Sequence, residues 1–98
     1  MSTTEERRVI LGGVVKLAEA IAETFSPLCE VVVHDLQNPA HSVVAIFNSM
    51  SGREVGSSAT ELGLARLNDP EFPDQLVNYE NAFPDGRRVK STSVGLRD

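Results

Sequence analysis

Hydrophobic and polar positions along the chain separate helical from extended segments. The first apolar stripe repeats at steps of three and four residues, the period of one face of an α-helix, through Ile10, Val14, Leu17, Ile21 and Phe25. Thr3 followed by Glu6 is a capping box at its start. Ser26-Pro27 ends it, because the residue before a proline avoids helical geometry. We predict an N-terminal helix within residues 1–26.

Two extended segments follow the helix. Residues 29–36 are rich in β-branched side chains that alternate between two faces, with Val31 and Val33 on one face and Val32 and His34 on the other. Residues 42–48 are a second apolar run, and the intervening Gln-Asn-Pro-Ala is turn chemistry. These segments predict a β-hairpin.

The second half of the chain predicts a short helix and a second hairpin. Ser58 and Glu61 form a capping box before an apolar run that ends at Leu67. Residues 76–83 and 87–96 are strands joined at Pro-Asp-Gly, a turn sequence. The order helix, strand, strand, helix, strand, strand predicts an α+β fold, with a mostly antiparallel sheet covered by helices.

Composition narrows the function classes. A chain of 98 residues holds one small domain, and its formal charge of -5 has the wrong sign for a broad surface that binds a phosphate backbone. No long apolar block suggests a signal peptide or a membrane span, so we expect a cytoplasmic protein. The single cysteine, Cys29, cannot form an internal disulfide.

The sequence gives little indication of a catalytic or metal-binding site. His34 and Asp35 are adjacent on a strand, so their side chains leave on opposite faces and cannot act as a bonded pair. Cys29, His34, Asp35 and His41 are metal-ligand types, but their spacing matches no compact metal motif. The serines lack a Gly-x-Ser-x-Gly elbow, and the glycines lack a phosphate-binding loop. We expect no catalytic residue, no metal and no cofactor.

Several sequence blocks in a fixed order resemble those of the YheO-like PAS domain family, the sensory domains of helix-turn-helix transcriptional regulators. They are the valine strand ending at His34-Asp35, the strand from Ser42 to Asn48, Gly52-Arg53, Asn78-Tyr79 and Lys90-Ser91. One departure is Ser49, where the family usually has glycine. The resemblance implies a single domain over 1–98, with an N-terminal helix at 1–26 and a PAS core at 28–98.

The resemblance also implies a five-stranded sheet in which the first and last strands are neighbours. This chain stops where the fifth strand would begin, so we expect a C-terminally truncated domain that lacks that strand and the DNA-binding segment. Each buried backbone group left unpaired costs about 1–3 kcal/mol. We therefore expect the exposed sheet edge to be covered by rearrangement, by the first helix or by another chain, and we predict homodimerisation or higher self-association.

The function implied is a sensory and dimerisation module that binds an unidentified small molecule, with no membrane contact and no DNA binding by this chain itself. The candidate ligand contacts are His34, Asn48, Arg53, Tyr79 and Lys90, polar groups at or beside the family blocks. Two alternatives remain for this chain. One is a ligand-free interaction module, in which Arg53 pairs with Glu54 or Glu61 at the surface; the other is a small enzyme that uses His34 or Cys29.

Overall fold

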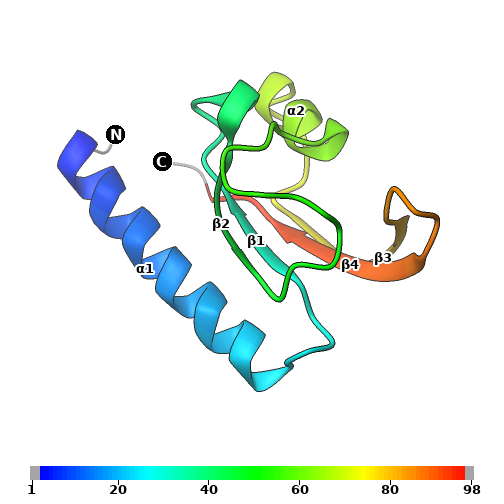
Figure 1. The fold of residues 1–98 in the computed structure, drawn as a ribbon. Coiled ribbons are helices and arrows are strands. Elements are labelled where there is room, and N and C mark those ends of the chain that lie inside the picture. Colours follow the sequence, from blue (N-terminus) through cyan, green and yellow to red (C-terminus); the bar gives the residue numbers. More distant parts are fainter. Residues whose placement is uncertain (1–2, 97–98) are drawn as a thin grey trace.

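The computed structural model describes residues 3–96 and confirms the α+β class (Figure 1). The elements in chain order are α1 (Thr4–Thr24), β1 (Val31–His34), a 3₁₀ turn η1 (Pro39–His41), β2 (Val43–Phe47), α2 (Glu61–Asn68), β3 (Gln75–Ala82) and β4 (Arg88–Val94). The predicted elements are thus all present within the described residues.

The N-terminal helix α1 begins at the predicted capping box. The Thr3 hydroxyl accepts from the Glu6 amide at 3.1 Å, and the Glu6 carboxylate accepts from the Thr3 amide at 3.2 Å. These bonds satisfy amides that have no partner inside the helix. The helix continues through Gly12-Gly13 and ends ahead of Ser26-Pro27.

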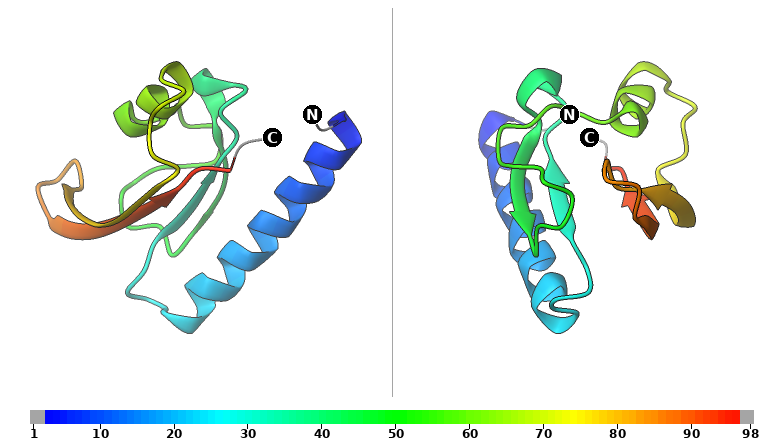
Figure 2. Two further views of the ribbon diagram at one scale, coloured as in Figure 1. Left: turned by 180° about the vertical axis from the view of Figure 1, so that it is seen from behind. Right: turned by 45° about the vertical axis from the view of Figure 1, so that its right-hand side comes forward.

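The face that α1 buries differs from the predicted apolar stripe. Ala18 and Ala22 are the buried side chains, and Val14 is the stripe residue that packs against the core. The other stripe residues are 42–64% exposed: Ile10, Leu17, Ile21 and Phe25. The reason is that the hairpin beneath α1 is two strands wide and meets the helix along its small-residue face (Figure 2). The larger side chains therefore lie beside the contact.

The first hairpin pairs β1 with β2 in antiparallel register, with Val33 opposite Ala45. A bulge follows Val33, so that His34 pairs with Val43. Val33, Ala45 and Ala18 form the centre of a small core between the hairpin and α1. The connection between the strands contains η1, where the sequence predicts a turn.

The helix α2 begins two residues later than its predicted cap. Thr60, rather than Ser58, is the N-cap, and its hydroxyl accepts from the Gly63 amide at 3.2 Å. The Ser58-Glu61 capping box is therefore wrong. Thr60 stands three residues before the amide it caps, the same spacing that Thr3 has from Glu6, and both hydroxyls can reach that amide.

The second hairpin pairs β3 with β4 and turns at Gly86, whose φ is 90°. A bulge interrupts the register between Leu76 and Tyr79, where Asn78 has a φ of 59°. Glycine and asparagine are the residues that tolerate this left-handed conformation best.

The two hairpins form separate two-stranded sheets, whereas the sequence pattern predicted one mostly antiparallel sheet. Within residues 3–96, β1 has β2 as its only strand neighbour and β4 has β3. The other edges of β1 and β4 face a shared space, with α1 behind the first hairpin and α2 above (Figures 1 and 2). This space contains the candidate site.

Candidate functional site

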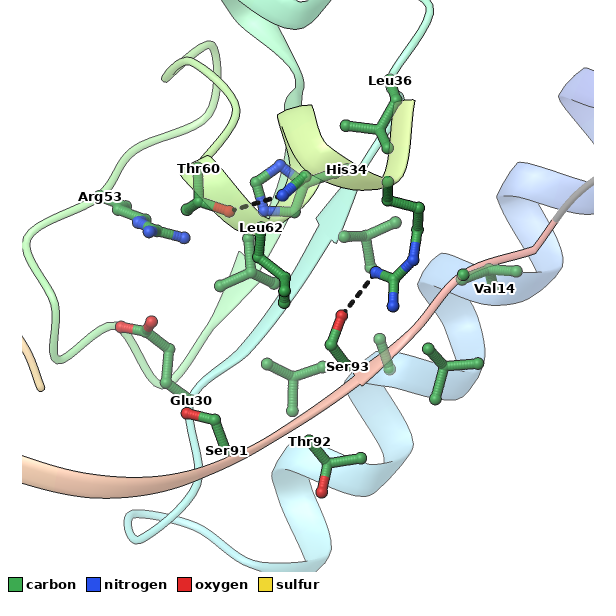
Figure 3. A pocket seen from close by; sticks show the side chains of 18 of the residues that line it. Val14, Glu30, His34, Leu36, Arg53, Thr60, Leu62, Ser91, Thr92 and Ser93 are labelled. Atoms are coloured by element: carbon green, nitrogen blue, oxygen red, sulfur yellow. Dashed lines mark hydrogen bonds between the residues drawn. The ribbon is translucent and has the colours of Figure 1, made fainter. Parts of the chain in front are cut away.

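An open cavity of about 1990 Å³ lies between the two hairpins, and α1, β1, α2 and β4 contribute side chains to its lining. Pockets for small molecules usually enclose about 300–1,000 Å³. The space is therefore large enough for a small molecule and for polypeptide that covers the free strand edges. Apolar side chains, including Leu36 and Leu62, line the part beside β1 together with polar groups (Figure 3).

The loop after β2 carries Arg53 to the cavity. One oxygen of the Glu30 carboxylate accepts from the amides of Met50 and Ser51 at 2.6 and 2.7 Å, which anchors the loop beside the start of β1. Gly52 follows with a φ of 84°, and Arg53 then lines the cavity. Across residues 3–96, no hydrogen bond or ion pair is found for the Arg53 guanidinium. It therefore lacks the Glu54 or Glu61 partner of the alternative interpretation.

His34 lies near Arg53 at the end of β1 (Figure 3). Its Nδ1 is 2.8 Å from the hydroxyl of Ser42, which is 1% exposed. Burial and, secondly, the positive charge of Arg53 lower the pKa of His34 below its usual 6.5. The imidazole is therefore neutral at neutral pH.

Asp35 serves the turn after β1 and does not contact the His34 ring. Its carboxylate accepts from the Gln37 amide at 3.0 Å, the pattern of an Asx turn. Arg7 of α1 approaches the same oxygen at 3.9 Å. The two adjacent residues therefore have separate roles. His34 contacts the Ser42 hydroxyl, and Asp35 caps the turn after β1.

Arg66, which was not among the candidates predicted from the sequence, lies at the cavity and is only 8% exposed. Its guanidinium donates to the Ser93 hydroxyl at 2.7 Å and to the carbonyls of Pro73 and Asp74 at 3.1 and 3.4 Å. The group also lies over the Phe72 ring, 5.3 Å from its centroid. Its Nε is buried without a hydrogen-bond partner. Arginine in a short amphipathic helix is usually exposed, so no sequence signal marks this residue.

The other candidate contacts occupy different positions. Asn48, with a φ of 54°, donates from its side-chain amide to the carbonyls of Ala22 and Cys29 at 2.8 and 3.0 Å, so this group joins α1 to β1. Tyr79 is half-buried and lines the cavity from β3. Lys90 lies on β4 at the cavity rim and is exposed. The structure therefore brings His34 and Arg53 together but gives Asn48 a bonding role elsewhere.

Residues of metal-ligand type are dispersed. Among residues 3–96, no group of three His, Cys, Asp or Glu side chains is arranged to hold a metal ion. Cys29 is a partly buried free thiol, and Nδ1 of His41 is 3.0 Å from the Gly56 carbonyl. Over the same residues, no helix has both the length and the apolar character needed to cross a bilayer.

Curated relatives match most of this chain. Transcriptional regulator DauR of Pseudomonas aeruginosa is 39% identical over 83 residues, which cover 84% of this chain and 37% of DauR. YheO of Escherichia coli K12, an uncharacterised protein, is 32% identical over 92 residues, covering 87% of this chain and 38% of YheO. An uncharacterised protein of Haemophilus influenzae is 26% identical over 96 residues, which cover 97% of this chain and 43% of that protein.

The chain thus spans about two fifths of the length of these relatives. No solved structure gives a significant match. The YheO-like PAS domain family matches residues 4–98, which include all seven helical and strand elements described above. The chain belongs to the YheO-like PAS domain family.

Proposed function

We propose that this chain is the sensory PAS domain of a bacterial transcriptional regulator and that it binds a small molecule in the cavity between β1 and β4. The observation that carries the proposal is the cavity itself, where Arg53 and the half-buried His34 lie beside apolar side chains. A few polar groups set in a largely apolar concave surface are typical of ligand sites. Family membership and the relative named as a transcriptional regulator support the regulatory role.

In this scheme a different part of the regulator contacts DNA. The formal charge of -5 opposes binding of this chain to a phosphate backbone. Ligand binding would act by favouring one of two arrangements of paired domains. A regulator of this kind works in the cytoplasm. Fluorescence anisotropy with duplex DNA should show no salt-dependent binding by the isolated chain, and such binding would contradict this part of the proposal.

The same contacts favour a role without catalysis. Nδ1 of His34 lies against the buried Ser42 hydroxyl, and the Asp35 carboxylate caps a turn. The Cys29 thiol is 3.9 Å from a backbone carbonyl, that of Glu30. The hydroxyl that His34 contacts is 1% exposed and so out of reach of a substrate. Among residues 3–96, no acidic or basic side chain is hydrogen-bonded to the Cys29 thiol to activate it.

We also propose that the domain pairs with a second copy of itself. The free edges of β1 and β4 each offer backbone groups for strand pairing. Large apolar side chains remain exposed along α1, among them Leu17 and Phe25. A dimer that pairs a free strand edge or covers the apolar stripe of α1 would bury surface that the monomer leaves exposed.

Two tryptophan substitutions on α2 test the ligand cavity. Leu62 lines the cavity, whereas Leu64, on the same helix, is 40% exposed and does not line it. We expect some members of a library of bacterial metabolites to raise the Tm of the chain, since a ligand that binds only the folded state stabilises it. Leu62→Trp should remove that shift and Leu64→Trp should keep it. Equal shifts in both variants, or no shift with any compound, would contradict the proposal.

A further inference from the structure

We propose that the cavity selects organic anions, and that a carboxylate of the ligand binds to the Arg53 guanidinium beside His34. This inference rests on the proposed function, because it names the ligand class of the same cavity. It goes further in assigning the charge of the ligand and the side chain that recognises it.

Arg53 lies at the cavity on a loop with an anchored backbone. Its loop is anchored by the two amides that donate to Glu30, and Gly52 turns the chain with a left-handed φ, so local structure sets the point from which the Arg53 side chain enters the cavity. The guanidinium carries a full positive charge and five donors arranged to match a carboxylate. No acceptor is found for it among the described residues. An arginine that faces a cavity without an acidic partner provides both the charge and the geometry for an anion.

The imidazole ring of His34 lies near Arg53 (Figure 3). A charged imidazole would repel Arg53, but burial and the charge of Arg53 lower the pKa of His34. His34 therefore adds a polar group next to the guanidinium without a second charge. An anion bound there would partly cancel the charge of Arg53.

The charge balance of the cavity lining also favours an anion. Basic side chains outnumber acidic ones around the cavity, although the whole chain has a formal charge of -5. Arg66 is buried there and no carboxylate pairs with its guanidinium within residues 3–96. The nearby Glu30 carboxylate is already held by two amides. Asp35 and Glu61 also line the cavity, and the Asp35 carboxylate is engaged by the Gln37 amide and by Arg7. Basic groups remain in excess, so an anion is favoured over a cation.

Apolar side chains of the cavity lining favour a ligand with an apolar part. Leu36 and Leu62 lie near His34 on the same side of the cavity (Figure 3). Removing apolar ligand surface from water against these side chains is favourable. The ligand class is therefore an organic acid with an apolar part, rather than an inorganic anion.

Benzoate and benzamide test this inference as a matched pair, because they share one ring and differ in charge. Titration of the ¹⁵N-labelled chain, followed by NMR, should give saturable shifts for benzoate at residues around His34 and Arg53. We expect benzamide to bind about tenfold more weakly or worse, since a charge-assisted bidentate contact is roughly twice as strong as a neutral one.

Two arginine variants separate the local effect from net charge. Arg53→Gln should weaken benzoate binding about tenfold or more and leave benzamide unchanged. Arg88→Gln removes the same charge at an exposed residue that pairs with Glu80 and does not line the cavity, and it should bind benzoate like the parent chain. Equal loss in both variants would overturn the inference.

The outcomes distinguish the inference from the function on which it rests. Equal binding of both probes at cavity residues would overturn anion selectivity and leave the ligand cavity supported. Absence of any saturable cavity shift with either probe would count against both. Retained benzoate binding in Arg53→Gln would remove Arg53 from the site even if anions are preferred.

Discussion

Asn48 and Asn78 illustrate how a backbone requirement can appear in a sequence as a family block. Both have positive φ, 54° and 59°. Asparagine tolerates the left-handed region better than other residues that carry a Cβ atom, apart from aspartate. At residue 48 the side chain also bonds two carbonyls, those of Ala22 and Cys29. The left-handed residue of this turn is Asn48 itself, so the turn does not require glycine at Ser49.

Substitution of Asn48 should destabilise the chain through both effects. Asn48→Ala removes two hydrogen bonds and places alanine at positive φ, so we expect a loss of about 2–4 kcal/mol in the free energy of unfolding. Asn48→Gly should cost roughly 0.5–1 kcal/mol less, because glycine adopts this φ without strain. Urea denaturation measures both. Ser49→Ala is the neighbouring control, and a loss for Asn48→Ala no larger than in that control would contradict the assignment.

Residue types alone could identify some groups of the site but not their contacts. Arg53 and His34 stand out as polar residues in the family blocks, and the fold brings them together. Arg66 is a single basic residue in a short helix. Its burial depends on the carbonyls of Pro73 and Asp74 and the hydroxyl of Ser93, which are 7, 8 and 27 residues away along the chain. Partners that lie so far along the chain leave no pattern in the sequence around Arg66.

Elements were predicted well where local chemistry determines them. The capping box of α1, the proline after it and the Pro-Asp-Gly turn each act within a few residues. The buried face of α1 and the separation of the two hairpins depend instead on which elements meet. Periodicity identified an apolar stripe through Leu17, but the hairpin contacts the alanine face at Ala18 and Ala22. Neither helix propensity nor hydrophobic periodicity specifies which face of α1 the hairpin contacts.

The contact between α2 and the end of β4 gives a prediction at the scale of elements. A Cβ atom built on Gly95 would lie 2.6 Å from the Cδ and Nε atoms of Arg66. Gly95→Ala should therefore push Arg66 away from its bonds and cost about 1–3 kcal/mol, the usual range for overpacking. In an Arg66→Ala background the same substitution should cost less than half as much, since the crowded atoms are gone. Thermal unfolding of the four proteins measures this coupling, and additive effects would refute it.

The whole molecule has a large surface for its mass. Its accessible surface is 7003 Å², whereas a folded monomer of 10.6 kDa is expected to expose about 5,500 Å². The difference of roughly 1,500 Å² exceeds the ~800 Å² that each partner buries in a standard interface. The buried hydrophobic residues among those described are small: Ala18, Ala22, Val33, Val43 and Ala45. The molecule therefore has apolar surface available for a second copy.

Sedimentation equilibrium tests this self-association directly. Leu17 is 64% exposed in the apolar stripe of α1, and a carboxylate there would have to be desolvated in any dimer that covers the stripe. We expect the parent chain to be dimeric at micromolar concentration, and Leu17→Glu to raise the dissociation constant by about tenfold or more. Ser58→Glu adds the same charge at an exposed loop residue and should leave the dimer intact. A parent chain that stays monomeric at 100-fold higher concentration, or equal weakening by both variants, would show that α1 does not form the contact.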